Sequence, residues 1–351
     1  MTKLSRYDHS WEDPGAFRVA EGVFRIPLPL PNDALRAVNV YAIVGERSLT
    51  LIDGGQHVVA ARQRLESSLA LIGAAIGDIS EFLVTHIHRD HYTQAIAIRE
   101  EFGTRVNLGA LEHPALDLIH SELRRREDRQ RPLLIACGAR ELADHTDSWD
   151  PEEETSRLLF QYPDAWLSDG DEIRVGGRTL RVISTPGHTQ GHVVFFDADD
   201  GVLFAGDHVL PHITPSIGLE PVRAKLPLGD YLGSLYKVRQ LQDSRLLPAH
   251  GPVVESLHGR IDELLAHHDL RLADAYQAVV SGNSTAYEVA RKLRWTSRGR
   301  DFLDLDLFNQ VLAVFESKYH LDLLSFRGQL DASLEDEVVR YSVGTVAMVP
   351  E

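Results

Sequence analysis

The chain has 351 residues, of which 43% are hydrophobic and 25% are charged, and this composition excludes a wholly disordered protein. Its 52 acidic residues outnumber the 36 basic ones, and the net charge of −16 opposes tight nonspecific binding to nucleic acid or to an anionic membrane. A lone cysteine, Cys137, excludes an intramolecular disulfide, and no signal peptide or bilayer-length apolar stretch is evident, so we expect a cytoplasmic protein that does not contact membranes.

Alternating apolar runs and amphipathic stretches in the first 110 residues predict an α/β fold. Strands are expected where β-branched and aromatic residues cluster between turn residues, at 23–28, 38–44, 48–52, 79–84 and 105–108. Helices are expected where apolar residues recur at helical spacing, at about 57–76 and 92–102.

From residue 111 to about 166 the alternation gives way to charged, helical patterns, which predict a helical insertion. Such an insertion is either a solvated surface excursion or a lid that shapes access to a site, and the sequence leaves both open. One helix of the insertion is expected to start at Pro151, where three glutamates follow in the first turn.

Strands return after the insertion and stop near residue 255. They are expected at 178–184, 193–197, 202–205 and 245–248, with a helix at 230–241 before the last of them. Beyond residue 255 the pattern predicts a hairpin within 328–343 after three helices, at 261–279, 285–293 and 305–324. In the last helix, Phe308, Val311, Leu312, Phe315 and Tyr319 fall on one face. The sequence therefore predicts two domains, 1–255 and 256–351.

A histidine-rich run at residues 86–91, with the sequence HIHRDH, directly follows the strand expected at 79–84. Three further signals also follow predicted strands, namely His188, Asp207 and His250. Imidazole nitrogens and carboxylate oxygens are the usual ligands of Zn²⁺ and its first-row neighbours. Because strand ends can converge on one edge of a sheet, these four segments predict a metal site there.

The same residues resemble the metallo-β-lactamase superfamily, whose signature is HxHxDH followed by distant His, Asp and His ligands. The resemblance covers nearly all of residues 20–255, with the insertion as its poorest match, and implies an αββα sandwich with two metals at one edge of the sheets. Carried onto this chain, it implies that the first metal is held by His86, His88 and His188, the second by Asp90, His91 and His250, and that Asp207 bridges both.

Seven ligands shared by two metals leave room for a water, as a catalytic site requires and a closed structural zinc site does not. Paired cations would lower the pKa of that water and supply a bridging hydroxide near neutral pH, to attack a carbonyl carbon or a phosphorus. Asp90 could also relay a proton, which would make Asp90 and Asp207 the catalytic carboxylates. Mixed His and Asp ligands favour Zn²⁺ and accept Fe or Mn.

Four other residues are candidates to support the ligands or to contact a substrate. Asp53 matches the superfamily's early Asp-Gly signal, which implies that it orients the ligand loop, with a plain turn aspartate as the alternative. We expect His192 to lie behind the ligands or to pack against the site. His208 and His212 follow Asp207 closely, and they either face a substrate or simply pack.

The C-terminal pattern resembles the winged-helix domain of one superfamily branch, which includes endoribonucleases and uncharacterised hydrolases. Winged helices often bind nucleic acid, and residues 291–300 are basic. Acidic residues at 301–306 and 335–337 instead favour packing or homodimerisation.

Three functions therefore stay open. The acidic composition favours a dinuclear hydrolase of a small acyl substrate, such as a thioester, lactone or ester. The superfamily branch favours a phosphodiesterase or endoribonuclease. A non-catalytic, metal-binding regulatory protein is the third class, and the complete ligand set argues against it.

Overall fold

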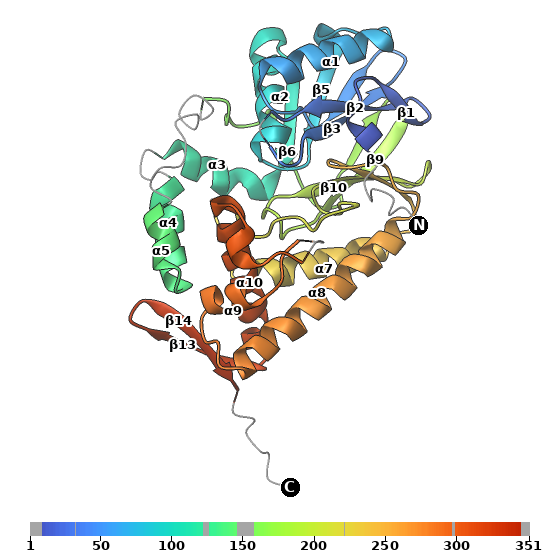
Figure 1. Ribbon diagram of the computed structural model, residues 1–351. Coiled ribbons are helices and arrows are strands. Elements are labelled where there is room, and N and C mark those ends of the chain that lie inside the picture. The colour runs from blue at the N-terminus through green and yellow to red at the C-terminus, as the bar shows by residue number, and fades with distance from the viewer. Residues whose placement is uncertain are drawn as a thin grey trace, which may run out of the picture.

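The computed structural model describes residues 9–31, 33–121, 126–145, 158–220, 222–296 and 299–344. Two β-sheets form the centre of the molecule, helices lie outside them, and a helical region with a small hairpin completes the chain (Figure 1). This layered α/β arrangement agrees with the expected fold class. The helix start predicted at Pro151 lies outside the described residues.

The first sheet contains seven strands that follow one another in chain order. They are β1 (Phe17–Ala20), β2 (Val23–Pro29), β3 (Ala37–Val44), β4 (Leu49–Ile52), β5 (Ile79–Val84), β6 (Arg105–Gly109) and β7 (Ala165–Leu167). Strands β1 to β4 pair antiparallel, whereas β4 to β7 pair parallel. Since parallel strands end at the same edge, the segments that follow β4, β5 and β6 emerge together.

The second sheet contains five strands in the spatial order β12-β11-β10-β9-β8. They are β8 (Glu172–Val175), β9 (Arg178–Ser184), β10 (Val193–Asp197), β11 (Val202–Gly206) and β12 (Arg245–Pro248). Only the pairing of β11 with β12 is parallel within this sheet. The segments that follow β11 and β12 therefore also emerge at one edge.

Three apolar clusters hold these layers together. The cluster between the sheets joins Ile43 and Leu83 of the first sheet to Val182 and Phe195 of the second. A second cluster lies between the first sheet and the helices α1 (Val59–Leu71) and α2 (Arg89–Phe102). A third cluster joins the second sheet to α7 (Pro227–Arg239) and to the C-terminal helices. Burial on both faces explains why most strands read as continuous apolar runs.

Two helix boundaries differ from those expected. Helix α1 ends at Leu71 rather than near residue 76, because Gly73 adopts a left-handed conformation with φ of 76° and stops the helix. Helix α2 begins at Arg89 rather than Tyr92, and the His88 carbonyl accepts from the amides of His91 and Tyr92. The second half of the histidine-rich run is thus the first turn of a helix. Short 3₁₀ turns lie at His9–Glu12, Ile76–Asp78, Ala110–Glu112 and Phe302–Asp304.

The predicted insertion contains α3 (His113–His120), α4 (Arg126–Ala136) and α5 (Arg140–His145). The expected end near residue 166 falls within β7, which pairs with β6 from Ala165 onward. A solvated excursion is wrong for α4 and α5, since Leu134 and Ala143 are buried in the cluster with the C-terminal helices. Cys137 is buried there too, as its mildly apolar surroundings predict.

The C-terminal region contains the three helices and the hairpin that the pattern predicts. They are α8 (Leu257–Val280), α9 (Ala286–Lys292), α10 (Leu307–Phe326), β13 (Leu330–Glu335) and β14 (Val338–Val343). Helix α10 packs against α4, α7, α8 and α9 (Figure 1). On the apolar face of α10, Val311, Phe315 and Tyr319 are buried, whereas Phe308 is 41% exposed. Within the part of the chain described above, the helices are too short or too polar to cross a membrane.

Candidate metal centre

The candidate ligands come from segments that follow strand ends at one edge of the two sheets. His86 and His88 follow β5, and His91 stands in the first turn of α2. On the second sheet, one candidate follows each of β9, β11 and β12, and these three are His188, Asp207 and His250. Rigid strands thus position each segment, although the segments are far apart along the chain.

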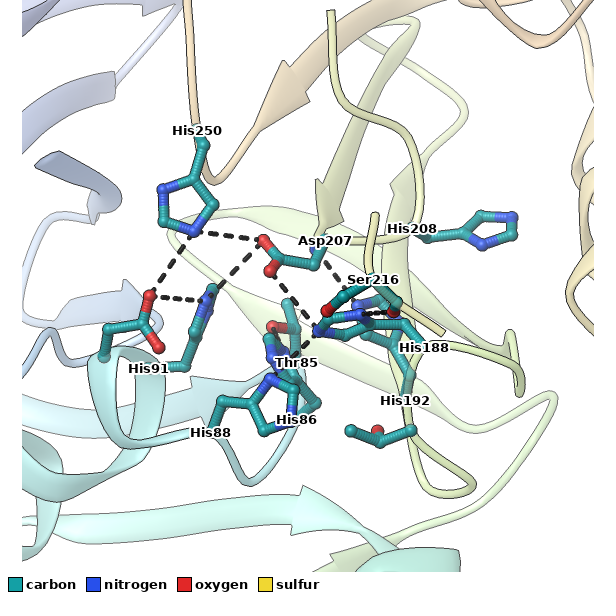
Figure 2. Close-up of polar contacts among 12 residues, drawn as sticks. Thr85, His86, His88, His91, His188, His192, Asp207, His208, Ser216 and His250 are labelled. Carbon is teal, nitrogen blue, oxygen red and sulfur yellow. Dashed lines mark hydrogen bonds and ion pairs between the residues drawn. The ribbon is translucent and has the colours of Figure 1, made fainter. Parts of the chain in front are cut away.

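The structure brings the seven candidate ligands into two adjacent groups. In each group one ligand atom of every member lies within 4.8 Å of the others. The first ligand group contains His86, His88, His188 and Asp207, and the second contains Asp90, His91 and His250. Figure 2 shows the five histidines and Asp207 converging from both sheets.

Asp207 lies between the groups and offers one carboxylate oxygen to each. Its Oδ2 is 3.4 Å from His188 Nε2 in the first group (Figure 2). Its Oδ1 is 3.4 Å from His250 Nε2 and 3.6 Å from His91 Nε2 in the second group. The two oxygens of Asp207 therefore face different ligand groups.

Most of the candidate histidines are oriented through Nδ1, the ring nitrogen that points away from the other ligands of the group. His188 Nδ1 lies 2.7 Å from the carbonyl oxygen of Ser216, and His250 Nδ1 lies 2.8 Å from that of Ala37. His86 Nδ1 lies 3.1 Å from Thr85 Oγ1. A hydrogen bond at Nδ1 fixes both the tautomer and the orientation of the ring, and it directs Nε2 into the group.

Four buried atoms in this centre have no hydrogen-bond partner among the described residues. They are His86 Nε2, His91 Nε2, His250 Nε2 and Asp207 Oδ1. An unpartnered buried polar atom costs about 1–3 kcal/mol, so a cluster of them requires a partner of another kind. Imidazole and carboxylate donors at this spacing fit divalent cations of the Zn²⁺ type.

The family model of the metallo-beta-lactamase superfamily matches residues 33–250, well over half of the chain, and the match ends at the last candidate ligand. The chain belongs to the metallo-beta-lactamase superfamily. Members of this superfamily are metal-dependent hydrolases, and the chain is an enzyme of that class.

Three curated superfamily relatives resemble the chain. Lactamase-like protein aptB of Emericella nidulans is 30% identical over 200 residues, covering 55% of this chain and 59% of that protein. Probable metallo-hydrolase YqjP of Bacillus subtilis is 26% identical over 329 residues, which cover 91% of this chain and 94% of that protein. Atrochrysone carboxyl ACP thioesterase of Aspergillus fumigatus is 27% identical over 254 residues, which cover 72% of this chain and 47% of that protein. The chain thus spans less than two thirds of aptB and of the thioesterase.

A solved superfamily structure is similar over almost the whole chain. The metallo-beta-lactamase family protein from Thermus thermophilus has a TM-score of 0.76 and 29% identity, and the match covers 93% of this chain and 100% of that chain. Because so little of the chain is left out, the match includes most of the C-terminal helical region.

The electrostatic surroundings of the two ligand groups differ. In the metal-free chain, burial and the nearby His188 lower the pKa of His88 to about 3. Burial also lowers the pKa of His91, but the carboxylates of Asp90, Asp53 and Asp207 outweigh burial and raise this pKa to about 10. The first ligand group is therefore electrically neutral at its histidines, whereas carboxylates dominate the second.

The Asp53 side chain connects Thr85, which precedes His86, to His91 in the first turn of α2. Its Oδ2 lies 2.9 Å from His91 Nδ1, and its Oδ1 accepts from the Thr85 amide at 2.7 Å and from the Thr85 hydroxyl at 3.0 Å. Asp53 is buried and holds a left-handed backbone conformation with φ of 63°, which is strained for a residue other than glycine. A plain turn aspartate would not need this set of contacts.

The three additional histidines lie in different places around the ligands. His192 is buried behind the site, where its Nε2 accepts from the Asp207 amide at 3.1 Å. His208 is fully buried, and its ring turns away from the ligands toward Tyr231 (Figure 2). Of the two alternatives for His208, packing is therefore the one that its position favours. His212 is exposed and lies near the segment that follows His250.

Two buried glutamates near the first ligand group were missed in the sequence. Glu112 Oε1 accepts from Thr189 Oγ1 at 2.5 Å and lies 3.4 Å from the Ile87 amide, so it touches the two segments that carry the histidines of this group. Glu220 Oε2 accepts from the Gln190 amide at 2.7 Å. Neither stands in a recognisable motif. The glycine at position 191 is an indirect trace of this packing. A Cβ there would lie 2.2 Å from the Glu112 nitrogen, so only glycine fits.

Proposed function

We propose that the chain is a dinuclear hydrolase, and that the two ligand groups hold one divalent cation each. The first cation would be held by His86, His88 and His188, the second by Asp90, His91 and His250, and both by Asp207. The observation that carries this proposal is the position of Asp207, whose two oxygens face different groups. Zn²⁺ suits these ligands best, and Fe or Mn would also be accepted.

Two cations bound here would lower the pKa of a water between them and so supply hydroxide near neutral pH. The residues of the chain determine how that chemistry is oriented. Asp207 sets the separation of the two groups, and Asp53 fixes the His91 ring through its Nδ1. The Asp90 side chain is 16% exposed and 3.4 Å from His250 Nε2, so it can pass a proton between the site and solvent.

The proposed substrate is a small acyl compound, a thioester, lactone or ester. A relative at 27% identity is named as a thioesterase of an acyl carrier protein, which supports acyl chemistry. A cavity of about 240 Å³ is lined by Ala110 after β6, Leu167 of β7 and Val193 of β10, together with Ser168, Asp169 and Ser184. Its apolar side chains suit the carbon skeleton of an acyl group.

We further propose a catalytic domain at residues 1–255 and a winged-helix-like domain at residues 256–351. The packing of α10 against α4 and α7 supports an architectural role for this second domain. Its hairpin exposes the carboxylates of Asp331, Glu335, Asp336 and Glu337, which would repel a phosphate backbone. Homodimerisation is compatible with this role, and nucleic acid binding is not favoured.

Parallel assays test the substrate class. The Zn²⁺-loaded protein would be incubated with acyl thioesters, lactones, bis-p-nitrophenyl phosphate and single-stranded RNA, with His88→Ala as the matched control. We expect turnover of an acyl substrate that the control loses. Fast cleavage of RNA or of the phosphodiester with inert acyl substrates would replace the acyl proposal with a phosphodiesterase. A lack of turnover in every assay, despite bound metal, would favour the non-catalytic, regulatory role.

A further inference from the structure

The segment formed by residues 216–220 touches the metal centre and the C-terminal region at once. At one end, the carbonyl oxygen of Ser216 lies 2.7 Å from His188 Nδ1 (Figure 2). At the other end, Glu220 accepts from the amide of Gln190, two residues beyond His188. The 216–220 segment therefore contacts the His188 loop on both sides of the candidate ligand.

Between these two contacts, the segment rests on helix α10. The hydroxyl of Tyr319 donates to the Gly218 carbonyl at 3.3 Å, and Tyr319 is only 4% exposed. A Cβ at Gly218 would lie 2.2 Å from the Tyr319 ring, and Gly218 has a φ of 74° that favours glycine. Side-chain packing and backbone conformation together fix Gly218 against α10.

The contact between α10 and this part of the chain continues beyond residue 220. The Arg223 guanidinium lies 5.9 Å from the centre of the Phe315 ring, one helical turn before Tyr319. Leu323, one turn after Tyr319, lies close to Gly229 at the start of α7. Helix α10 thus contacts Gly218, Arg223 and Gly229, and a shift of the 216–220 segment would break buried contacts with it.

We infer that Tyr319 is a positioning residue for the first metal, because it holds the 216–220 segment in the place from which Ser216 orients His188. This inference rests on the proposed metal site. It makes the C-terminal region part of the metal centre rather than a separate attachment. A group that orients a ligand histidine usually contributes about 10- to 100-fold to metal affinity.

The test isolates the first ligand group in the full-length chain. A His91→Ala parent removes a ligand of the second group, so that Zn²⁺ titration against a chromophoric chelator measures the first site. Tyr319→Ala and Tyr319→Phe are then added to this parent. We expect roughly 10-fold weaker Zn²⁺ binding for Tyr319→Ala. Tyr319→Phe keeps the ring and loses one hydrogen bond, so we expect about fivefold weaker binding.

Tyr341→Phe is the matched control, because the Tyr341 hydroxyl donates to Asp322 on α10 instead of the 216–220 segment. It should leave Zn²⁺ affinity unchanged. Melting curves would check that both Tyr319 variants are folded. If both are folded and their Zn²⁺ affinity is unchanged, the inference about Tyr319 is wrong, whereas the proposed function still stands. If Tyr319→Ala does not fold, the Tyr319→Phe result decides. A parent that binds no Zn²⁺ would contradict the proposed function and this inference with it.

Discussion

The two ligand groups use the same kinds of side chain, yet their surroundings are opposite. In the first group, burial and neighbouring histidines hold the pKa of His86 and His88 well below the usual range. In the second group, burial has the same effect, but neighbouring carboxylates outweigh it and raise the pKa of His91 and His250. Uncharged histidines can accept a cation directly, whereas protonated ones must first release a proton.

The supports of the two groups differ as well. His188 in the first group is oriented by a backbone carbonyl, and the same loop is held by two buried glutamates. In the second group, His91 is oriented by a carboxylate, that of Asp53. The supports therefore differ at His91, which is held by a carboxylate, whereas His188 and His250 are both oriented by backbone carbonyls. Asp207 is the residue that both groups share.

The largest effect is expected from removing the shared residue. Asp207→Ala should lose both cations and lower hydrolysis by more than about 100-fold, because both groups lose an oxygen ligand. Metal content by elemental analysis and initial rates would check this. Asp199→Ala, at an exposed turn, is the control. Two metals per chain in purified Asp207→Ala would refute the bridging role.

Removing one ligand from each group should separate the two sites. His88→Ala should lose the first cation and His250→Ala the second, and each should bind about one metal per chain after treatment with a chelator and reloading. We expect turnover to be abolished in both, because hydroxide is supplied by the pair. The stoichiometry of Zn²⁺ binding checks this. If both variants keep two metals, the division into two groups is wrong.

A smaller effect is expected at Asp53, which acts only through His91 and Thr85. Asp53→Asn keeps the size of the side chain but loses the charge, so Zn²⁺ binding at the second group should weaken about 10- to 100-fold. Binding at the first group should change less. A two-step Zn²⁺ titration distinguishes the sites, and equal weakening of both steps would contradict the assignment of Asp53 to the second group.

The smallest effect on metal binding is expected at Glu112, where the readout is stability against pH. Burial raises the pKa of Glu112 from 4.5 to about 7. Between these values the folded chain binds a proton that the unfolded chain has released, so stability falls as pH rises from about 4.5 to about 7. Glu112→Gln removes this loss, which is about 1.4 kcal/mol for each unit of pKa shift.

We therefore expect Glu112→Gln to raise the melting temperature of the metal-free chain, relative to wild type, by more at pH 8 than at pH 5. Glu172→Gln is the matched control, because Glu172 is exposed on β8. An equal difference between Glu112→Gln and wild type at both pH values would show that Glu112 does not titrate with the shifted pKa.

Much of the fold was predictable because the local signals are strong. Apolar runs located most of the strands through β12, and helical spacing located α8 and α10. The errors arise where tertiary contacts override the local pattern. The strand β7 is only three residues long and exists because it pairs with β6. The early start of α2 is a local error instead, since the helix begins at Arg89 and the His88 carbonyl accepts from the His91 and Tyr92 amides.

The sequence by itself predicted a metal centre, because seven His and Asp side chains in segments that follow strands are rare unless they bind metal. It could not determine how the ligands are supported. Thr189 meets Glu112 across 77 residues, and Tyr319 meets Gly218 across 101. Such contacts leave no periodic trace in the chain, because each depends on two segments that only folding brings together. Only the tertiary structure brings carboxylates around His91 and His250, and only it places the 216–220 segment between His188 and helix α10.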